Sequence, residues 1–333
     1  MLAFPANLRD IDGTGRGRGF VPDGMVLISA FQSSGDVIAD RRADYARQLA
    51  EGGEPAAAAD LMEQALELVP EWTAGWDLLG GFHEKAGATA QAISAWRHLE
   101  ALDDDGVFGA RLKLAAHGAK SAGDGTAVSY VEALFDQYAP KFETALVDRL
   151  GYRVPEMLDD LLSSVMAERS WVRFADALDL GCGTGLMGAR LRERVDLLEG
   201  IDLSAAMIAE TGRKGIYDRL AKAELVEFLL ARPAPADLLT AADVFIYCGA
   251  LPPVLAACAA AMRQGALLVF SLEEHEGEEP VFLRPSLRYA HNGEATKAAL
   301  ADAGFAVLRF ERATLRQDRG APIRGMLVVA QKS

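Results

Sequence analysis

The sequence predicts an α/β fold in which a doubly wound sheet follows a small all-helical domain. From residue 174 onward, short apolar runs alternate with helix-like segments, a pattern typical of a parallel sheet covered by helices. Between residues 41 and 105, apolar residues follow helical periodicity and repeat at an offset of 34. We expect a disordered leader at 1–40, helical repeats at 41–120 and the α/β domain at 121–333.

The α/β region is expected to contain seven strands, with helices between most of them. The composition of residues 121–126 indicates a linker ahead of this region, and the charged segment 312–323 should connect the last two strands. The expected strands are 174–180, 196–202, 222–226, 243–248, 266–272, 305–310 and 325–331.

Length, charge and cysteine usage narrow the class of protein. A chain of 333 residues is long enough for two domains, and no apolar run reaches the roughly 18 residues of a membrane span. The net charge of −14 opposes a nucleic-acid partner. The three cysteines, Cys182, Cys248 and Cys258, lack paired or metal-binding spacing and fit a reducing compartment. We expect a cytoplasmic protein with no membrane insertion and no bound metal.

The helical region contains two copies of one repeat. Gly53 aligns with Gly87 at the offset of 34, and the second copy has Trp76, Leu79 and Gly80 where tetratricopeptide repeats place Trp, Leu and Gly. The region therefore resembles that repeat family, which implies a possible protein partner for its helices. Two copies are fewer than the three or so that stand alone, so the next helix or the α/β domain should cover the open face.

A glycine-rich turn follows the strand expected at 174–180. Gly181, Gly183 and Gly185 let the backbone fold tightly and approach a ligand. The helix expected from Leu186 would direct free N–H groups toward that ligand. The combination indicates an enzyme with a nucleoside-containing cofactor.

The positions of the glycines relative to the end of the strand distinguish between two cofactors. A literal GxGxxG runs from Gly183 to Gly188, which would indicate NAD. A dinucleotide fingerprint, however, places its first glycine directly after the strand, at Gly181, and Leu186 then occupies the position of the third glycine. Asp179, inside the strand, would repel a pyrophosphate but suits an ammonium group. These points favour S-adenosylmethionine and leave an NAD-dependent oxidoreductase as the weaker alternative.

Residues 178–185, Leu-Asp-Leu-Gly-Cys-Gly-Thr-Gly, and residues 200–204, Gly-Ile-Asp-Leu-Ser, resemble class I S-adenosylmethionine-dependent methyltransferases. With its repeats, the chain is similar to bacterial predicted methyltransferases that carry tetratricopeptide repeats. The resemblance implies a Rossmann-like sheet closed by an antiparallel strand, and it implies that Asp202 holds the ribose. Asp202 lies 17 positions after Gly185, close to the roughly 20 expected for a ribose-binding acid. A helix cap at Asp202 or Ser204 is the alternative.

Further cofactor contacts are expected at the carboxyl ends of the strands, where ligands of open α/β sheets lie. The resemblance implies that Glu224 binds the adenine amino group, with plain surface as the alternative. It also implies that Tyr138 and Phe135, in a Phe-Asp-x-Tyr-Ala-x-x-Phe segment, form a lid, with simple core packing as the alternative. The predicted cofactor-binding residues are Asp179, Gly181, Cys182, Gly183, Gly185, Asp202, Leu203, Met207, Glu224, Leu225, Tyr247 and Tyr138.

Residues 283–291 are the densest patch of other candidates. Arg284 and Arg288 suit a carboxylate of the substrate, because the guanidinium is planar and presents paired donors. Tyr289 and His291 are the candidate catalytic residues, since each can take a proton from an oxygen or nitrogen acceptor, and Tyr289 can also contact the substrate. A packing or capping role is the alternative for His291.

The predicted function is methyl transfer to an oxygen, nitrogen or carbon of a small-molecule acceptor. Such a transfer is an in-line displacement in which alignment and exclusion of water matter more than a strong base, so cofactor residues are easier to predict than catalytic ones. The alternative is an interaction protein with an inactive domain. Ala250 leaves room for that alternative, because related sequences often place a polar residue there.

Overall fold

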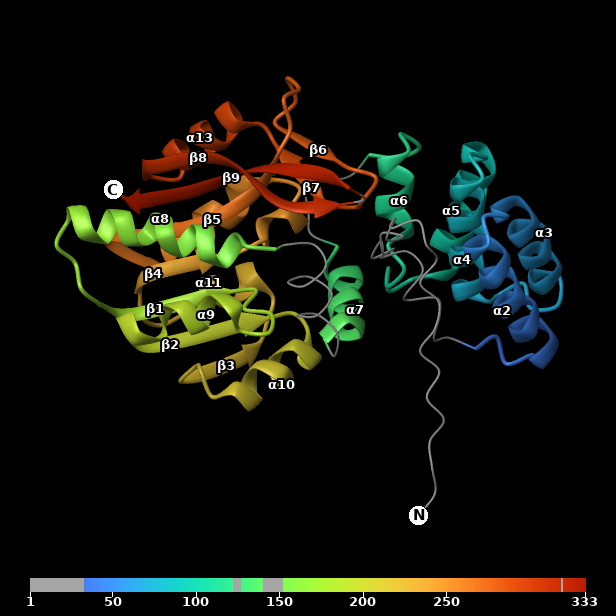
Figure 1. Ribbon diagram of the computed structural model, residues 1–333, viewed down its shortest axis with the longest axis horizontal. Coiled ribbons are helices and arrows are strands. Elements are labelled where there is room, and N and C mark those ends of the chain that lie inside the picture. The colour runs from blue at the N-terminus through green and yellow to red at the C-terminus, as the bar shows by residue number, and fades with distance from the viewer. Residues whose placement is uncertain (1–32, 122–126, 140–151, 319) are drawn as a thin grey trace, which may run out of the picture.

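The computed structural model describes residues 33–121, 127–139, 152–318 and 320–333. A helical array lies to one side of an α/β domain, and helix α7 (Val128–Tyr138) lies between them (Figure 1). Most of the expected leader, nearly all of the expected linker and the end of the lid segment at Phe142 lie outside the described residues.

The helical array repeats in space as it does in sequence. Its helices form successive antiparallel pairs, and the turns at Gly53 and Gly87 both adopt left-handed backbone, with φ of 89° and 75°. The first helix begins at Val37, four residues before the expected start. Membership of the tetratricopeptide family stays a prediction. The helices are α2 (Val37–Glu51), α3 (Pro55–Leu66), α4 (Thr73–Lys85), α5 (Thr89–Leu102) and α6 (Ala110–Ala116).

Close approach between α4 and α5 depends on a glycine. A Cβ at Gly80 would lie 2.1 Å from the indole nitrogen of Trp96, which is fully buried. The buried ion pair between Asp77 and Lys113 then joins α4 to α6. Small and large residues thus alternate across the helix pairs, as close packing requires.

The α/β domain contains one mixed sheet. Its parallel part has the order β3-β2-β1-β4-β5, β9 runs antiparallel to β5, and β8 pairs with β9. The predicted doubly wound sheet with an antiparallel end is therefore confirmed. The strands are β1 (Phe174–Leu180), β2 (Val195–Asp202), β3 (Arg219–Lys222), β4 (Ala236–Ala241), β5 (Met262–Glu274), β6 (Val281–Leu283), β7 (Tyr289–His291), β8 (Phe305–Asp318) and β9 (Ala321–Lys332).

Helices cover both faces of this sheet because its central strands are apolar on both sides. Ala177 of β1 faces the cluster formed by α8 and α9, whereas its neighbour Leu178 faces the cluster that includes α12. Asp179 comes next and shares the α8 face with Ala177. The helices are α8 (Val154–Glu168), α9 (Leu186–Leu191), α10 (Ala205–Lys214), α11 (Leu225–Ala231), α12 (Leu251–Ala260) and α13 (Gly293–Asp302).

Three strand predictions need correction. The expected strand 243–248 is wrong: β4 ends at Ala241, and Phe245–Tyr247 forms a short 3-10 helix. A short apolar run does not distinguish the two states by periodicity. The third strand ends at Lys222, because Glu224 caps α11. The charged segment 312–323 is mostly strand, because β8 and β9 extend as a hairpin beyond the core.

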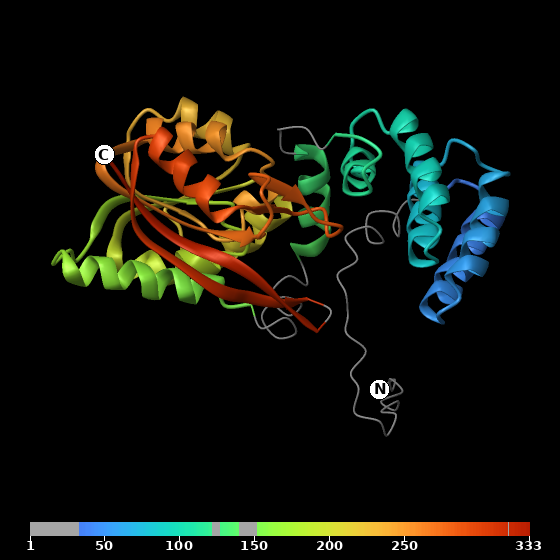
Figure 2. The ribbon, with the colours of Figure 1, turned by 90° about the horizontal axis from the view of Figure 1, so that it is seen from above.

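The open end of the helical array packs on the α/β domain. Leu283, Leu287 and Tyr289, from the β6–β7 hairpin, are buried in the same apolar cluster as Phe108 and Tyr130 of the helical side. Figure 2 shows α6 and α7 beside this hairpin. The α/β domain thus helps to cover the face that two repeats alone would leave open.

Candidate functional site

The glycine turn joins β1 to α9 through three residues in left-handed backbone. The φ values are 58° at Gly181, 53° at Gly183 and 88° at Gly185. These conformations favour glycine, and a Cβ at Gly181 would also lie 2.6 Å from the side chain of Val244. The Cys182 N–H donates to the carbonyl of Ile201 at 2.9 Å, which ties the turn to β2. The turn therefore forms a tight, fixed cradle at the end of β1.

Asp179 is buried one position before the end of β1, with 1% of its surface exposed. One carboxylate oxygen accepts from the Tyr217 hydroxyl at 2.6 Å, and the other accepts from the Thr240 hydroxyl at 2.7 Å. Burial raises the pKa of Asp179 to about 6, and the two hydroxyl donors partly offset that rise.

Asp202, the last residue of β2, binds the glycine turn directly. Its oxygens accept from the backbone N–H groups of Gly183 at 2.9 Å and Ser204 at 2.8 Å. The cap of α10 is Ser204, whose hydroxyl accepts from the Met207 N–H at 3.0 Å. Asp202 is therefore not the helix cap, and its carboxylate lies at the turn where the prediction puts a ribose.

The two acids share one electrostatic feature. Among the residues that the structure describes, neither Asp179 nor Asp202 forms an ion pair. Burial raises the pKa of both carboxyl groups, and the charge of Asp202 further raises that of Asp179. A buried carboxylate without a counter-ion is costly, so this end of the sheet favours a positively charged ligand.

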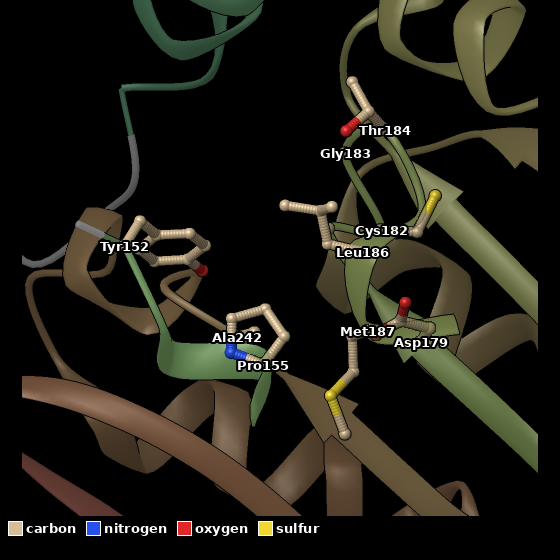
Figure 3. Close-up of a pocket in the computed structure, with 10 residues that line it drawn as sticks. Tyr152, Pro155, Asp179, Cys182, Gly183, Thr184, Leu186, Met187 and Ala242 are labelled. Carbon is tan, nitrogen blue, oxygen red and sulfur yellow. The ribbon is translucent and has the colours of Figure 1, made fainter. Parts of the chain in front are cut away.

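A small pocket, partly open to solvent, adjoins the turn. In Figure 3, Tyr152 and Pro155 face the glycine turn, and Leu186 points toward Tyr152. Tyr152 and Pro155 were not predicted, although a proline next to the start of a helix is a recognisable signal. The hydroxyl of Thr184 also lines the pocket, buried and without a hydrogen bond among the described residues.

Helix α7 lies beside this end of the sheet, where a lid is predicted. Asp136 accepts from the Ser204 hydroxyl at 2.6 Å and from the Ala206 N–H at 3.1 Å, at the start of α10. Phe135 packs edge-on against Tyr247, with ring centroids 5.5 Å apart. The Tyr138 side chain is partly buried against the helical cluster. The lid role of Tyr138 stays a prediction, while the helix that carries it docks next to Asp202.

The other predicted cofactor residues divide into two groups. Leu203 and Tyr247 are half-buried against the helical side, and Met207 is fully buried. Glu224 caps α11 by accepting from the Glu227 N–H at 2.8 Å, and Leu225 is half-buried against the apolar cluster that includes α12. For Glu224, capping is thus an observed role, and the adenine contact stays a prediction.

Cys182 lies in the turn as a buried side chain. Burial raises the pKa of its thiol well above the usual range, and the nearby charge of Asp179 acts in the same direction. A protonated, buried thiol is a poor nucleophile. Cys182 therefore contributes its backbone and its small size to the turn.

The predicted substrate arginines surround a buried acid. Glu273, 1% exposed near the end of β5, forms ion pairs with Arg284 at 3.1 Å and Arg288 at 3.7 Å. Arg316 of β8 binds Glu273 as well, and it donates to Asp243 at 2.7 Å. No local sequence signal predicts this network, because its members come from four distant segments.

The predicted catalytic pair does not line the pocket. Tyr289 is 2% exposed and belongs to the apolar cluster of the helical side. His291 is also 2% exposed, next to the backbone of Cys248 and Gly249, and burial lowers the pKa of its ring to about 4. The burial of His291 fits the alternative role, in which it packs in the core.

Two kinds of feature are absent from the described parts of the chain. No three His, Cys, Asp or Glu side chains in those parts come together in an arrangement that would hold a metal ion. Within the same parts, every helix is too short or too polar to cross a membrane.

Residues 178–268 match the family described as a methyltransferase domain. The chain is 32% identical to human methyltransferase-like protein 27 over 124 residues, 35% of this chain and 49% of the relative. It is 27% identical to malonyl-[acyl-carrier protein] O-methyltransferase of Hamiltonella defensa over 143 residues, 42% of this chain and 51% of the relative. The alignments thus span about half the length of these curated relatives.

The solved structures that resemble this chain include an S-adenosylmethionine-dependent methyltransferase from Clostridium acetobutylicum. The two are 18% identical with a TM-score of 0.46, and the match covers 60% of this chain and 99% of the other. The predicted cofactor, S-adenosylmethionine, agrees with the family match over the glycine turn. Residues 178–268, which include the glycine turn and both acids, are thus similar to methyltransferase domains.

Proposed function

We propose that the protein transfers a methyl group from S-adenosylmethionine to a small-molecule acceptor. The observation that carries this proposal is the pair of buried carboxylates, Asp179 and Asp202, that flank the glycine turn without a counter-ion among the described residues. The cofactor carries an ammonium and a sulfonium, which suit such a pair. The diphosphate of NAD would be repelled there, so an oxidoreductase is not favoured.

The residues of the turn fit this cofactor. Asp202 would accept from the ribose hydroxyls, Asp179 would act through its charge on the ammonium, and Thr184 would offer its buried hydroxyl. When bound, the cofactor supplies a methyl group activated by the sulfonium. The chain contributes alignment and exclusion of water, with α7 docked beside the turn by Asp136.

We further assign the acceptor an anionic group, held by Arg284 and Arg288. Their side chains stay 31% and 20% exposed, although both contact Glu273. The distances from Arg288 to Glu273 and Asp318, 3.7 and 3.9 Å, are longer than hydrogen bonds. Arg288 also bonds Tyr247, but a guanidinium has five N–H donors, so its other donors can bind a carboxylate. The relative that methylates a malonyl group is consistent with a carboxylated acceptor.

Calorimetric titration with S-adenosylmethionine tests the cofactor. We expect saturable binding, and a dissociation constant about tenfold to a hundredfold higher in Asp202→Ala, because two charged hydrogen bonds are lost. Asp196→Ala, on the exposed end of the same strand, is the matched control and should bind normally. Absence of binding, or binding of NAD instead, would refute the proposal.

The acceptor needs a separate experiment. Metabolite pools incubated with the protein and S-adenosylmethionine should contain an anionic compound that gains the mass of one methylene. Arg288→Met should reduce that product, whereas Arg263→Met, an exposed arginine paired with Asp237 at the opposite end of the sheet, should not. A methylated product without any anionic group would contradict the assignment of the arginines.

A further inference from the structure

Three glycines surround one tyrosine ring beneath the glycine turn. A Cβ at Gly188 of α9 would lie 2.2 Å from the ring and hydroxyl of Tyr217, and one at Gly200 of β2 would lie 2.9 Å from the ring. A Cβ at Gly185 would approach the same ring to 3.3 Å. The tyrosine therefore occupies a passage that exists only because these positions lack side chains.

The passage leads to Asp179. The Tyr217 hydroxyl donates to one carboxylate oxygen of Asp179 at 2.6 Å, and the ring is partly buried against the apolar cluster of α8 and α9 on their face of the sheet. Burial raises the pKa of the hydroxyl well above the usual range, so it remains a donor across the physiological pH range. The tyrosine thus reaches from the edge of the domain to the acid at the cofactor end of β1.

The segment that carries Tyr217 is fixed on both sides. Gly215 ends α10 in left-handed backbone, with φ of 64°. The next acid, Asp218, accepts from the Leu198 N–H and from Arg192, each at 2.7 Å. Arg192 also donates to the carbonyl of Ile216 at 3.2 Å. The backbone on either side of the tyrosine is therefore anchored to β2 and to the end of α9.

We propose that Tyr217 is a positioning residue that holds Asp179 and the glycine turn in the geometry that binds the cofactor, and that Gly188 is a glycine in order to admit its ring. The positioning of Asp179 for the cofactor rests on the proposed function. The requirement for glycine at position 188 does not. That requirement explains why a literal GxGxxG ends at Gly188, although the glycine spacing after the strand does not fit NAD.

A double-mutant cycle on the protein without cofactor tests the passage. Gly188→Ala should lower the melting temperature by about 5 °C when Tyr217 is present, because the added methyl overpacks the site. In the Tyr217→Ala background the same change should cost less than about 1 °C. Gly212→Ala, whose Cβ would meet only Leu220 at 3.8 Å, is the matched control and should leave the melting temperature near that of the wild type.

An equal fall in melting temperature from Gly188→Ala in both backgrounds would overturn the proposed role of Gly188. The glycine would then be required for helix packing or for the ligand itself. If Tyr217→Ala does not fold, Tyr217→Leu keeps the test, because it also removes the hydroxyl and ring atoms nearest Gly188. The cycle needs no cofactor, so its outcome is independent of the proposed function.

The positioning role is tested by S-adenosylmethionine binding as a function of pH. Tyr217→Phe keeps the ring but removes the hydroxyl, so the dissociation constant should rise about tenfold at pH 7. The midpoint of its pH dependence should move upward, because Asp179 loses a donor that lowers its pKa. Thr240→Val removes the other donor without touching the passage and should also move the midpoint upward.

The groups that face Asp179 allow the midpoint of the pH dependence to be assigned to its carboxyl group. Cys182, Tyr152 and Tyr217 stay protonated through neutral pH because burial raises the pKa of each, so Asp202 is the other nearby acid that titrates. An unchanged affinity and midpoint in Tyr217→Phe would overturn the positioning role. If the wild type binds no S-adenosylmethionine, the proposed function itself fails, and the cycle still decides the role of Gly188.

Discussion

Two pairs of acids lie at the carboxyl ends of neighbouring strands, and their partners differ. Glu273, buried within β5, and Asp243, half-buried just after β4, form ion pairs with Arg316, which is itself 5% exposed. Asp179 and Asp202, on β1 and β2, receive only hydroxyl and backbone N–H donors. The first pair is neutralised within the chain, whereas the second has no counter-ion among the described residues. We expect a cationic ligand to bind at the second pair, and burial alone would not distinguish the two pairs.

The largest effect on stability should come from removing the arginine that neutralises Glu273 and Asp243. Arg316→Met leaves Glu273 and Asp243 without their shared partner and should destabilise the protein by about 3–5 kcal/mol, measured by urea unfolding. Arg312→Met, also on β8 but 60% exposed beside Glu274, should cause little loss. Equal effects of the two substitutions would mean that the buried network contributes no more than a surface pair.

Removing the charge of Asp179, from the other pair, should instead stabilise the protein. Asp179→Asn removes a carboxylate whose pKa is raised to about 6, so the protein without cofactor should gain about 1–3 kcal/mol of stability at pH 7.5. The same variant should bind S-adenosylmethionine more weakly. Loss of stability in Asp179→Asn would show that the Tyr217 and Thr240 bonds outweigh the cost of the buried charge.

The pH dependence of stability follows from the raised pKa of Asp179. A carboxyl group whose pKa is higher in the folded state binds its proton more tightly there, so its ionisation weakens folding as pH rises from about 4 through 6. The unliganded protein should therefore lose about 1–3 kcal/mol from this group between pH 4 and 7.5. The loss should be smaller in Asp179→Asn, as measured by urea unfolding at each pH. An identical slope in the two proteins would argue against the raised pKa.

The smallest effect concerns the docked helix. Asp136→Ala removes acceptors for Ser204 and Ala206 and should cost about 1 kcal/mol of stability. If α7 acts as a lid, the substitution should also raise the dissociation constant for S-adenosylmethionine about threefold, a change that calorimetry resolves. Asp44→Ala, on the exposed side of α2, is the control and should alter neither quantity. An unchanged affinity in Asp136→Ala would restrict α7 to a packing role.

The glycine turn was predictable from sequence because its determinants are local. Gly181, Gly183 and Gly185 adopt left-handed backbone within five positions, and Asp179 and Asp202 lie at or next to the ends of strands whose apolar character is plain. Most of the sheet followed from the same alternation. The strand expected at 243–248 failed, since Phe245–Tyr247 is an apolar run that forms a 3-10 helix instead.

The other features depend on contacts between distant segments. Tyr217 reaches Asp179 across 38 positions, and Arg316 reaches Asp243 across 73. Arg284 and Tyr289 were assigned to a substrate from their chemistry alone. The ion pair of Arg284 with Glu273 and the burial of Tyr289 in the helical cluster became visible only in three dimensions. Residue type predicts what a group can do, and the fold decides what it faces.

Asp179 and Asp202, which lack an ion pair among the described residues, are proposed to bind a cationic cofactor. The most direct test is the affinity for S-adenosylmethionine between pH 5 and 8, measured by calorimetry for the wild type and Asp179→Asn. We predict that the wild-type affinity rises about tenfold as pH increases through the pKa of about 6, and that the variant shows a weaker, flatter dependence. The same pH dependence in both proteins, or tighter binding at low pH, would contradict the claim.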